Sequence, residues 1–375
     1  MVRFVHTADL QLGKPFRRFG DRGDELRRRR EEAVSKLAGV AAEKEVDFVV
    51  VAGDFFDANT VPDRVVARAC QRLGEFEVPV YLLPGNHDAS GGPDSVYRRD
   101  KFGRQVPEHV KVLDEAVAQP VAGGEAVLLP APLQFRHSRR DPTEHLTGDF
   151  GREEAGDGVR IGVAHGGVID FDSGSGHNVI DPRRAQRAEL DYLALGDWHG
   201  CKKINERTWY SGTPEPDSFQ DNEPGHCLVV DIEASGASAQ VEQVETAQTD
   251  WIAHSVTLQE RSDLNRLERW FEDLARPLET MVKLEYRGTL SFEDLARFKD
   301  QVLDDAGDRL LWMEARDEGL VARASEQELE EMTAEGFVGE TVERLREMMD
   351  GDPERAATAG RSLQVLYRMM KTRGQ

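Results

Sequence analysis

The chain has 375 residues and a formal net charge of −22; residues 1–203 carry 29 basic against 33 acidic residues, and residues 204–375 carry 19 against 37. This length suffices for two or three domains with a large core, and the acidic excess argues against a protein that simply coats DNA. The three cysteines form no CxxC pair. No apolar run approaches membrane-spanning length, and the N-terminal residues lack the apolar core of a signal peptide. We therefore expect a cytoplasmic protein without a membrane segment.

The first part of the chain alternates predicted strands and helices. Residues 2–7 are expected to form a strand and residues 24–44 an amphipathic helix. The β-branched run over residues 47–52 is typical of a strand that is buried on both faces of a parallel sheet. A helix that begins at Pro62 and a strand over residues 79–83 continue the succession. This β-α-β-α-β order indicates a layered α/β domain with right-handed crossovers.

The middle of the chain is predicted to be richer in strands than in helices. Residues 14–24 and 89–108 are expected to be irregular and basic, and residues 133–158 to form a polar loop. Further strands are predicted over residues 110–113, 126–129, 159–164, 192–195, 209–211 and 227–232. We therefore expect an α/β fold with two β-rich layers flanked by helices.

The later part of the chain differs in composition. A boundary is predicted near residues 234–250, where small and polar residues dominate and apolar periodicity fades. Residues 251–317 then read as strand, helix, strand, helix and strand, which indicates a small α+β domain. From residue 325 on, the chain is predicted to be helical, with two apolar stripes that could pack on their own domain or dock a partner helix.

Polar side chains follow five of the predicted strands. They lie in Asp9-Leu-Gln11, Gly53-Asp54, Gly85-Asn86-His87-Asp88, Ala164-His165-Gly166 and Gly196-Asp197-Trp198-His199. A single Gly-Asp after a strand is most often a turn, but the carboxyl ends of strands in open α/β sheets are where ligands bind. Five such ends, each with carboxylate, amide or imidazole groups, predict one metal site.

These groups suit the hydrolysis of a phosphoester. The reaction needs a deprotonated water, neutralised phosphoryl oxygens and a proton for the leaving oxygen, and two metal ions about 3.5–4 Å apart supply the first two. The predicted ligands are Asp54 as the bridge, Asp9 and His199 on the first ion, and Asn86, His165 and Asp197 on the second. Oxygen and imidazole donors without a thiolate favour Mn²⁺, Mg²⁺ or Fe²⁺.

His87 follows a predicted ligand directly and is expected to face the substrate. Its imidazole can donate a proton to the leaving oxygen or brace the phosphate, and the carboxylate of Asp57 is expected to orient it. Other polar groups have plainer interpretations: His6 as a structural residue, Asp88 as a turn residue, and residues 27–30 as a solvated helix surface.

The five motifs resemble those of the calcineurin-like metallophosphoesterase family over residues 1–212, and the opening residues and the later domains resemble its DNA-repair exonuclease branch, of SbcD type. The resemblance implies a four-layer α-β-β-α core with a two-manganese site, and exonuclease and endonuclease action on DNA. It also implies three parts: a catalytic domain over residues 1–235, a DNA-contacting α+β capping domain over residues 250–318 and a helical tail over residues 325–375.

Two positions depart from the family pattern, which usually has His where this chain has Gln11 and Asp197. Gln11 offers only a neutral amide oxygen, whereas Asp197 adds a charge and a hard oxygen. We expect both to remain metal ligands, with the first ion bound less tightly. Two other functions stay open: a phosphodiesterase or phosphatase for small molecules, and a catalytically weakened scaffold that binds DNA ends or an ATPase.

A DNA nuclease needs basic side chains around its site, because duplex DNA carries about one charge per 1.7 Å. The predicted nucleic-acid contacts are Arg17, Arg18, Arg98, Arg99, Lys101, Arg104, Lys202 and Lys203, with solvated surface as the alternative interpretation. The expected partners are DNA and, from the resemblance, a coiled-coil SMC-type ATPase (SbcC-like) at the C-terminal helices. A homodimer stays open as well.

Overall fold

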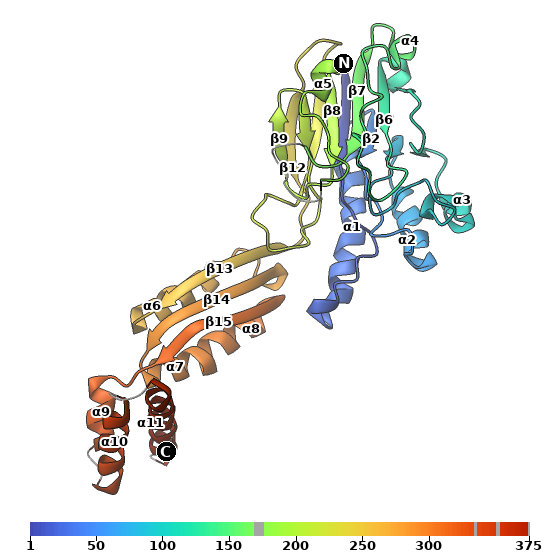
Figure 1. The fold of residues 1–375 in the computed structure, drawn as a ribbon. Coiled ribbons are helices and arrows are strands. Elements are labelled where there is room, and N and C mark those ends of the chain that lie inside the picture. Colours follow the sequence, from blue (N-terminus) through green and yellow to red (C-terminus); the bar gives the residue numbers. More distant parts are fainter. Residues whose placement is uncertain (169–175, 334–335, 350–352, 374–375) are drawn as a thin grey trace. The chain divides into compact units, whose positions relative to one another are not determined.

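The computed structural model describes residues 1–168, 176–333, 336–349 and 353–373. The chain divides into two compact units, residues 1–249 and residues 250–375 (Figure 1). Among the helices of the described residues, none has both the length and the apolar character needed to cross a membrane.

The first unit contains two six-stranded sheets. The order of the first sheet is β12-β11-β1-β2-β3-β4. Its strands are β1 (Val2–Thr7), β2 (Phe48–Val51), β3 (Val80–Leu82), β4 (Val110–Val112), β11 (His226–Ile232) and β12 (Gln240–Glu245). Neighbouring strands from β1 to β4 are parallel, whereas β11 pairs antiparallel with both β1 and β12. The carboxyl ends of β1, β2 and β3 therefore lie at one edge.

The second sheet has the order β5-β6-β7-β8-β10-β9. Its strands are β5 (Gln119–Val121), β6 (Ala126–Ala131), β7 (Val159–His165), β8 (Tyr192–Gly196), β9 (Lys202–Asn205) and β10 (Thr208–Tyr210). The four central strands are parallel, and the edge strands β5 and β9 are antiparallel to their neighbours. The carboxyl ends of β7 and β8 consequently share an edge too.

Helices cover the outer face of each sheet. On the first sheet these are α1 (Arg22–Glu43), α2 (Asp63–Leu73) and α3 (Asp100–Gln105), and on the second α4 (Arg152–Ala155) and α5 (Arg184–Arg187). Aromatic rings fill the space between the sheets: Phe4 stacks on Phe48 with centroids 5.1 Å apart and meets Tyr192 edge-on at 5.6 Å. Short 3₁₀ helices lie at Arg17–Phe19, Val96–Arg98 and Ala122–Gly124.

The second unit is a parallel three-stranded sheet with helical crossovers and a helical tail. Its strands are β13 (Asp250–Leu258), β14 (Thr280–Leu290) and β15 (Trp312–Ala322). The crossovers are α6 (Arg261–Glu272), a 3₁₀ turn (Pro277–Glu279), α7 (Phe292–Arg297), a π-helical turn (Phe298–Val302) and α8 (Leu303–Arg309). The tail comprises α9 (Glu326–Thr333), α10 (Gly336–Met349) and α11 (Pro353–Arg373). The predicted fold class is confirmed: a four-layer α-β-β-α core, a small α+β domain and a helical tail.

Three segments contain more secondary structure than expected. The two units divide between residues 249 and 250, inside the predicted boundary segment, but residues 240–245 of that segment form β12, because an edge strand can leave most of its side chains polar and exposed. The basic segment 89–108 contains a 3₁₀ turn and α3, since Phe102 is buried against Tyr97, with ring centroids 5.4 Å apart. The polar loop 133–158 contains the short helix α4.

Candidate metal centre

The loops after β1, β2, β3, β7 and β8 bring predicted ligands together. Single ligand atoms of Asp9, Asp54 and His165 all lie within 4.8 Å of one another, and all three residues are buried. Asp197 Oδ1 lies 3.6 Å from His165 Nε2, and Asn86 Nδ2 donates to the same oxygen at 3.3 Å. The two sheets thus contribute to one polar cluster, with Asp9, Asp54 and Asn86 from the first and His165 and Asp197 from the second.

The backbone of these loops adopts conformations that are rare outside glycine. Asp9, Gln11, Asp54 and Asp197 have φ angles of 56°, 43°, 54° and 99°. Such left-handed residues cost roughly 1–3 kcal/mol each and persist only where the surrounding fold imposes them. Gly53 has φ 97°, and a Cβ there would lie 2.1 Å from a ring nitrogen of His165. The first residue of the Gly-Asp motif therefore has to be glycine for the imidazole to fit.

The His165 side of the cluster fits a divalent ion. His165 Nδ1 donates to a backbone carbonyl at 2.9 Å, so Nε2 faces Asp54 Oδ1 at 3.5 Å. Within the described residues, neither His165 Nε2 nor the buried Oδ1 of Asn86 has a hydrogen-bond partner. Burial lowers the pKa of His165, but Asp54, Asp9 and Asp197 outweigh it and raise the pKa well above its usual value. The carboxylates therefore favour a cation at Nε2, which a metal ion would provide.

The two innermost carboxylates differ in their affinity for a proton. Burial raises the pKa of Asp9 to about 6, against the lowering effect of His199 and His165. Burial also raises that of Asp54, but His165 and His87 outweigh it and bring the pKa to about 2. Asp54 Oδ1 in addition accepts the backbone N–H of His87 at 2.8 Å. Asp54 thus stays ionised at neutral pH, as a central metal ligand must.

His87 lies beside the cluster with its imidazole partly exposed. Its Nε2 is 3.9 Å from Asp54 Oδ2, and its Nδ1 is 2.7 Å from the backbone carbonyl of Asp57. Because a carbonyl only accepts, Nδ1 carries a proton and Nε2 is the atom left for a substrate. The group of Asp57 that accepts the imidazole hydrogen bond is the backbone carbonyl, whereas the sequence suggested the carboxylate.

His199, on the opposite side, belongs to a closed hydrogen-bonded ring of four side chains. Its Nδ1 lies 3.1 Å from Asp217 Oδ1, and its Nε2 lies 3.3 Å from Gln11 Nε2. Lys14 Nζ donates to Gln11 Oε1 at 2.9 Å and to Asp217 Oδ2. The nearest approach of His199 Nε2 to Asp9 is 4.0 Å. We call Lys14, Gln11, His199 and Asp217 the Lys14 ring.

Comparison with known proteins decides the family. The sequence profile of the calcineurin-like phosphoesterases matches residues 2–201. The chain belongs to this family. Members are metal-dependent hydrolases of phosphoesters, and the buried Asp9, Asp54 and His165 can hold such a metal. The predicted family is therefore confirmed.

Several relatives are similar to this phosphoesterase at low identity. An uncharacterized metallophosphoesterase of Bacillus subtilis, YhaO, is 27% identical over 53% of this chain and 48% of its own length. The DNA double-strand break repair protein Mre11 of Methanosarcina acetivorans is 23% identical over 79% and 48%, and a subunit of the nuclease SbcCD of Bacillus subtilis is 23% identical over 62% and 66%. The chain thus spans about half to two thirds of the length of these relatives. Among solved structures, TT1561 of Thermus thermophilus superposes with a TM-score of 0.41 and 12% identity, over 65% of this chain and 99% of that one.

Three residues of the phosphoesterase site have no signal in the sequence: Lys14, Arg30 and Asp217. Arg30, expected on a solvated helix surface, is only 2% exposed, and its guanidinium donates to the carbonyls of Asp9 and Leu10 and lies 3.7 Å from Asp217 Oδ2. Burial raises the pKa of Asp217, but His199, Arg30 and Lys14 hold it far below its usual value. Only proximity in the fold identifies these residues, because Asp217 lies 18 positions after His199 outside any motif.

Two other buried polar residues support the phosphoesterase core without joining the metal cluster. His6 is structural, as expected: its ring nitrogens contact the Tyr192 hydroxyl at 3.0 Å and a backbone carbonyl at 3.2 Å, and burial lowers its pKa to about 3. Asp88 lies in the bend after β3, as expected, but its side chain is fully buried. Its carboxylate accepts two backbone N–H groups, at 2.7 and 3.0 Å, and the Tyr97 hydroxyl at 2.6 Å. Asp88 thereby ties the loop after β3 to the loop after β2.

The predicted nucleic-acid contacts fall into two groups. Arg99 donates to the carbonyls of Asn59 and Val61, so it braces the loop after β2. Arg99 is partly exposed, and so is Lys101; the remaining predicted contacts are exposed: Arg17, Arg18, Arg98, Arg104, Lys202 and Lys203. Of these, Arg104 pairs with Asp100 and Lys203 with Glu206 on the surface.

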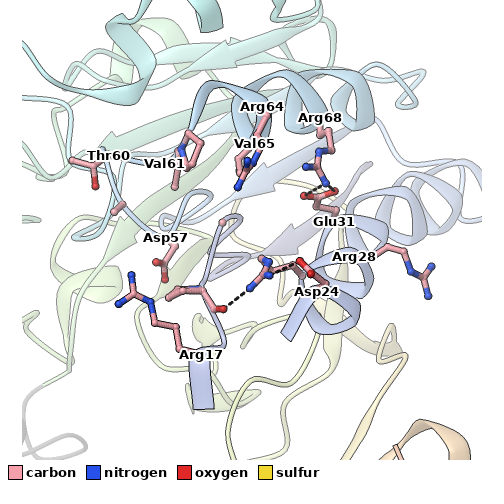
Figure 2. Close-up of a pocket in the computed structure, with 15 residues that line it drawn as sticks. Arg17, Asp24, Arg28, Glu31, Asp57, Thr60, Val61, Arg64, Val65 and Arg68 are labelled. Atoms are coloured by element: carbon pink, nitrogen blue, oxygen red, sulfur yellow. Dashed lines mark hydrogen bonds and ion pairs between the residues drawn. The ribbon is translucent and has the colours of Figure 1, made fainter. Parts of the chain in front are cut away.

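An arginine-rich pocket opens beside Asp57 (Figure 2). Its volume is about 730 Å³, and its basic residues are Arg17, Arg27, Arg28, Arg64 and Arg68. Arg27 pairs with Asp24 and Arg68 with Glu31. Within the described residues, by contrast, neither Arg17 nor Arg64 forms an ion pair. The pocket thus presents two arginines without an ion pair, next to the residue whose carbonyl holds His87 and whose carboxylate also lines the pocket.

Proposed function

We propose that this calcineurin-like phosphoesterase hydrolyses phosphodiester bonds of DNA, as an exonuclease and endonuclease in DNA repair. One observation carries the proposal: Asp57 contacts His87 beside the metal cluster and also lines the arginine pocket. Its carbonyl holds His87, and the residue lines the pocket with Arg17 and Arg64. A strand whose scissile phosphate lies at the cluster can therefore place a neighbouring phosphate among the arginines. The names of two relatives, a DNA double-strand break repair protein and a nuclease subunit, agree with this substrate.

The proposed chemistry begins with a divalent ion held by Asp9, Asp54, Asn86, His165 and Asp197. We favour Mn²⁺ over Mg²⁺ or Fe²⁺, because the set mixes carboxylate and amide oxygens with an imidazole. When bound, the ion lowers the pKa of a coordinated water and neutralises phosphoryl oxygens. Asp54 stays ionised, His165 presents Nε2 and Asn86 presents its unpartnered Oδ1.

His87 completes the reaction in this proposal. Because its Nδ1 proton is held by the Asp57 carbonyl, the protonated imidazole can give up a proton only from Nε2. That proton goes to the oxygen of the leaving nucleotide, a role that contributes about 10²–10⁴-fold in comparable enzymes. His87 is thus proposed as the catalytic acid, and Asp57 as the residue that positions it.

The second unit is proposed to bind DNA and a partner. Residues 250–318 would contact DNA as a capping domain, and residues 325–375 would bind a coiled-coil SMC-type ATPase. Large apolar side chains on the tail support the second part: Phe337 is 84% exposed, Val365 57% and Met369 56%. Phe337 lies on α10, and Val365 and Met369 lie on α11. Exposed apolar surface of this kind is typical of protein interaction sites.

The test uses purified protein with Mn²⁺, labelled linear duplex DNA and bis-p-nitrophenyl phosphate. We expect cleavage of both substrates and loss of both in His87→Ala, which retains its metal. The double variant Arg17→Gln/Arg64→Gln should weaken DNA cleavage and its salt dependence while it leaves the small ester unaffected. Arg72→Gln is the matched control, because Arg72 lies on the same helix as Arg64 but outside the pocket.

Other outcomes would support one of two different functions. Cleavage of the small ester alone would identify a phosphodiesterase for small molecules. Neither reaction, despite bound metal, would identify a scaffold that binds DNA ends or an ATPase.

A further inference from the structure

The two sides of the cluster are not equivalent as metal sites. On the His165 side, a ring nitrogen and an amide oxygen are buried without hydrogen bonds among the described residues. On the other side, the predicted ligand atoms of Gln11 and His199 are both engaged within the Lys14 ring. Of the predicted ligands to a first ion, that leaves Asp9 and the shared Asp54, and both already belong to the group with His165.

The contacts within the Lys14 ring determine which atoms carry the hydrogens. An ammonium only donates, so the Gln11 atom at 2.9 Å from Lys14 Nζ must be the oxygen. The Gln11 amide nitrogen then points at His199 Nε2, 3.3 Å away, and donates to its lone pair. A carboxylate only accepts, so His199 Nδ1 donates to Asp217. Each contact is consistent with the others, and the lone pair that a metal would need on His199 Nε2 already accepts a hydrogen bond from Gln11.

The ring also places the Lys14 ammonium in this half of the site. The Lys14 ammonium pairs with Asp217, whose carboxylate is 2% exposed and also lies 3.7 Å from Arg30. A divalent ion at His199 would have to break the Gln11 contact and stand close to the ammonium, in a partly buried place where charges repel more strongly than in water. The residues on this side therefore do not fit a second ion.

We propose that the enzyme binds one divalent ion tightly, on the Asp9, Asp54 and His165 side, and that the Lys14 ammonium takes the place of the second ion as a fixed monovalent cation. Lys14 Nζ has three protons, of which two are used by Gln11 and Asp217. The third has no acceptor within the described residues, and the Lys14 side chain is 28% exposed. This proton is placed to bind a non-bridging oxygen of the substrate phosphate. The inference rests on the proposed function only for that last role.

The test counts metal ions without any substrate. The wild type, dialysed against Mn²⁺ and freed of excess ion, is analysed by inductively coupled plasma mass spectrometry and by electron paramagnetic resonance. We expect about one ion per chain and the hyperfine pattern of an isolated Mn²⁺. The double variant Gln11→His/Lys14→Met removes the ammonium and supplies an imidazole, and it should bind about two ions with the spectrum of an exchange-coupled pair.

Lys111→Met is the matched control, because it removes one lysine charge from an exposed position on β4, and it should keep one ion. Two equally tight ions in the wild type would overturn the proposal, whatever the variants do. So would a double variant that melts like the wild type and still binds one ion. Because no DNA is present, these results are independent of whether the enzyme proves to be a nuclease.

Discussion

Arg30 offers a sharp test of how the site is held. It is buried in α1, and its guanidinium donates to the carbonyls of Asp9 and Glu215, both at 2.8 Å, and of Leu10. Arg30→Met keeps most of the aliphatic volume but removes the guanidinium donor from those carbonyls and a buried positive charge from beside Asp217, which then keeps only His199 and Lys14 as partners. Removing one partner of a buried charged network typically costs about 3–5 kcal/mol. We expect a loss of that size in the free energy of unfolding.

The assay is urea-induced unfolding followed by circular dichroism, with Mn²⁺ affinity measured in parallel. Arg28→Met is the control two positions away: its side chain is 54% exposed and pairs with Glu25 and Glu32, so it should cost less than about 1 kcal/mol. Arg30→Lys should fall between the two, since an ammonium cannot reproduce the forked contacts. A loss below about 1 kcal/mol in Arg30→Met would refute the reasoning.

Three further predictions concern the core of the site. Gly53→Ala should lower Mn²⁺ affinity about 10–100-fold by displacing the His165 imidazole, whereas Gly236→Ala, also at positive φ but with nothing within 4 Å of its Cβ, should leave affinity unchanged in the same titration. Burial lowers the pKa of His6 in the folded protein to about 3, from an ordinary value of 6.5. Below pH 6.5 the unfolded chain therefore binds a proton that the folded protein does not, and the free energy of unfolding decreases as the pH falls. In His6→Gln the melting temperature should depend less on pH over that range, and an unaltered slope would contradict this. Asp88→Asn should destabilise by about 1–3 kcal/mol in chemical unfolding, because an amide nitrogen would then face a backbone N–H.

Much of the first unit could be predicted because the chemistry lies next to strong local signals. β2 is a β-branched strand, and Gly53-Asp54 follows it directly. A strand that is buried on both faces is recognised by a continuous apolar run of residues. The carboxyl ends of parallel strands lie at the same edge of the sheet, where ligands bind. The order of strands and helices, and the family, followed from these features.

Other parts of the site depend on contacts that no local pattern encodes. Arg30 resembles its neighbours on α1 in sequence, and only the fold buries it. Lys14 and Asp217 are 203 positions apart in the sequence, so their contact could not be predicted from a local pattern. The contact of His87 with a carbonyl rather than a carboxylate depends on the local path of the loop at Asp57. Edge strand β12 was not predicted because its exposed, polar side chains resemble the composition of a linker.

The left-handed backbone at four predicted ligands has a consequence for how the metal is acquired. Because backbone hydrogen bonds between the loops, from the Asp9 N–H to Gly53 and from the Gln11 N–H to Asp54, hold these turns, the coordinating atoms have little freedom left to lose when an ion binds. Amide hydrogen exchange in the loops after β1, β2 and β8 should therefore be nearly the same in apo and loaded protein. A chelator would strip activity while it leaves the architecture standing, unlike the collapse that follows when a structural zinc is withdrawn from a small finger.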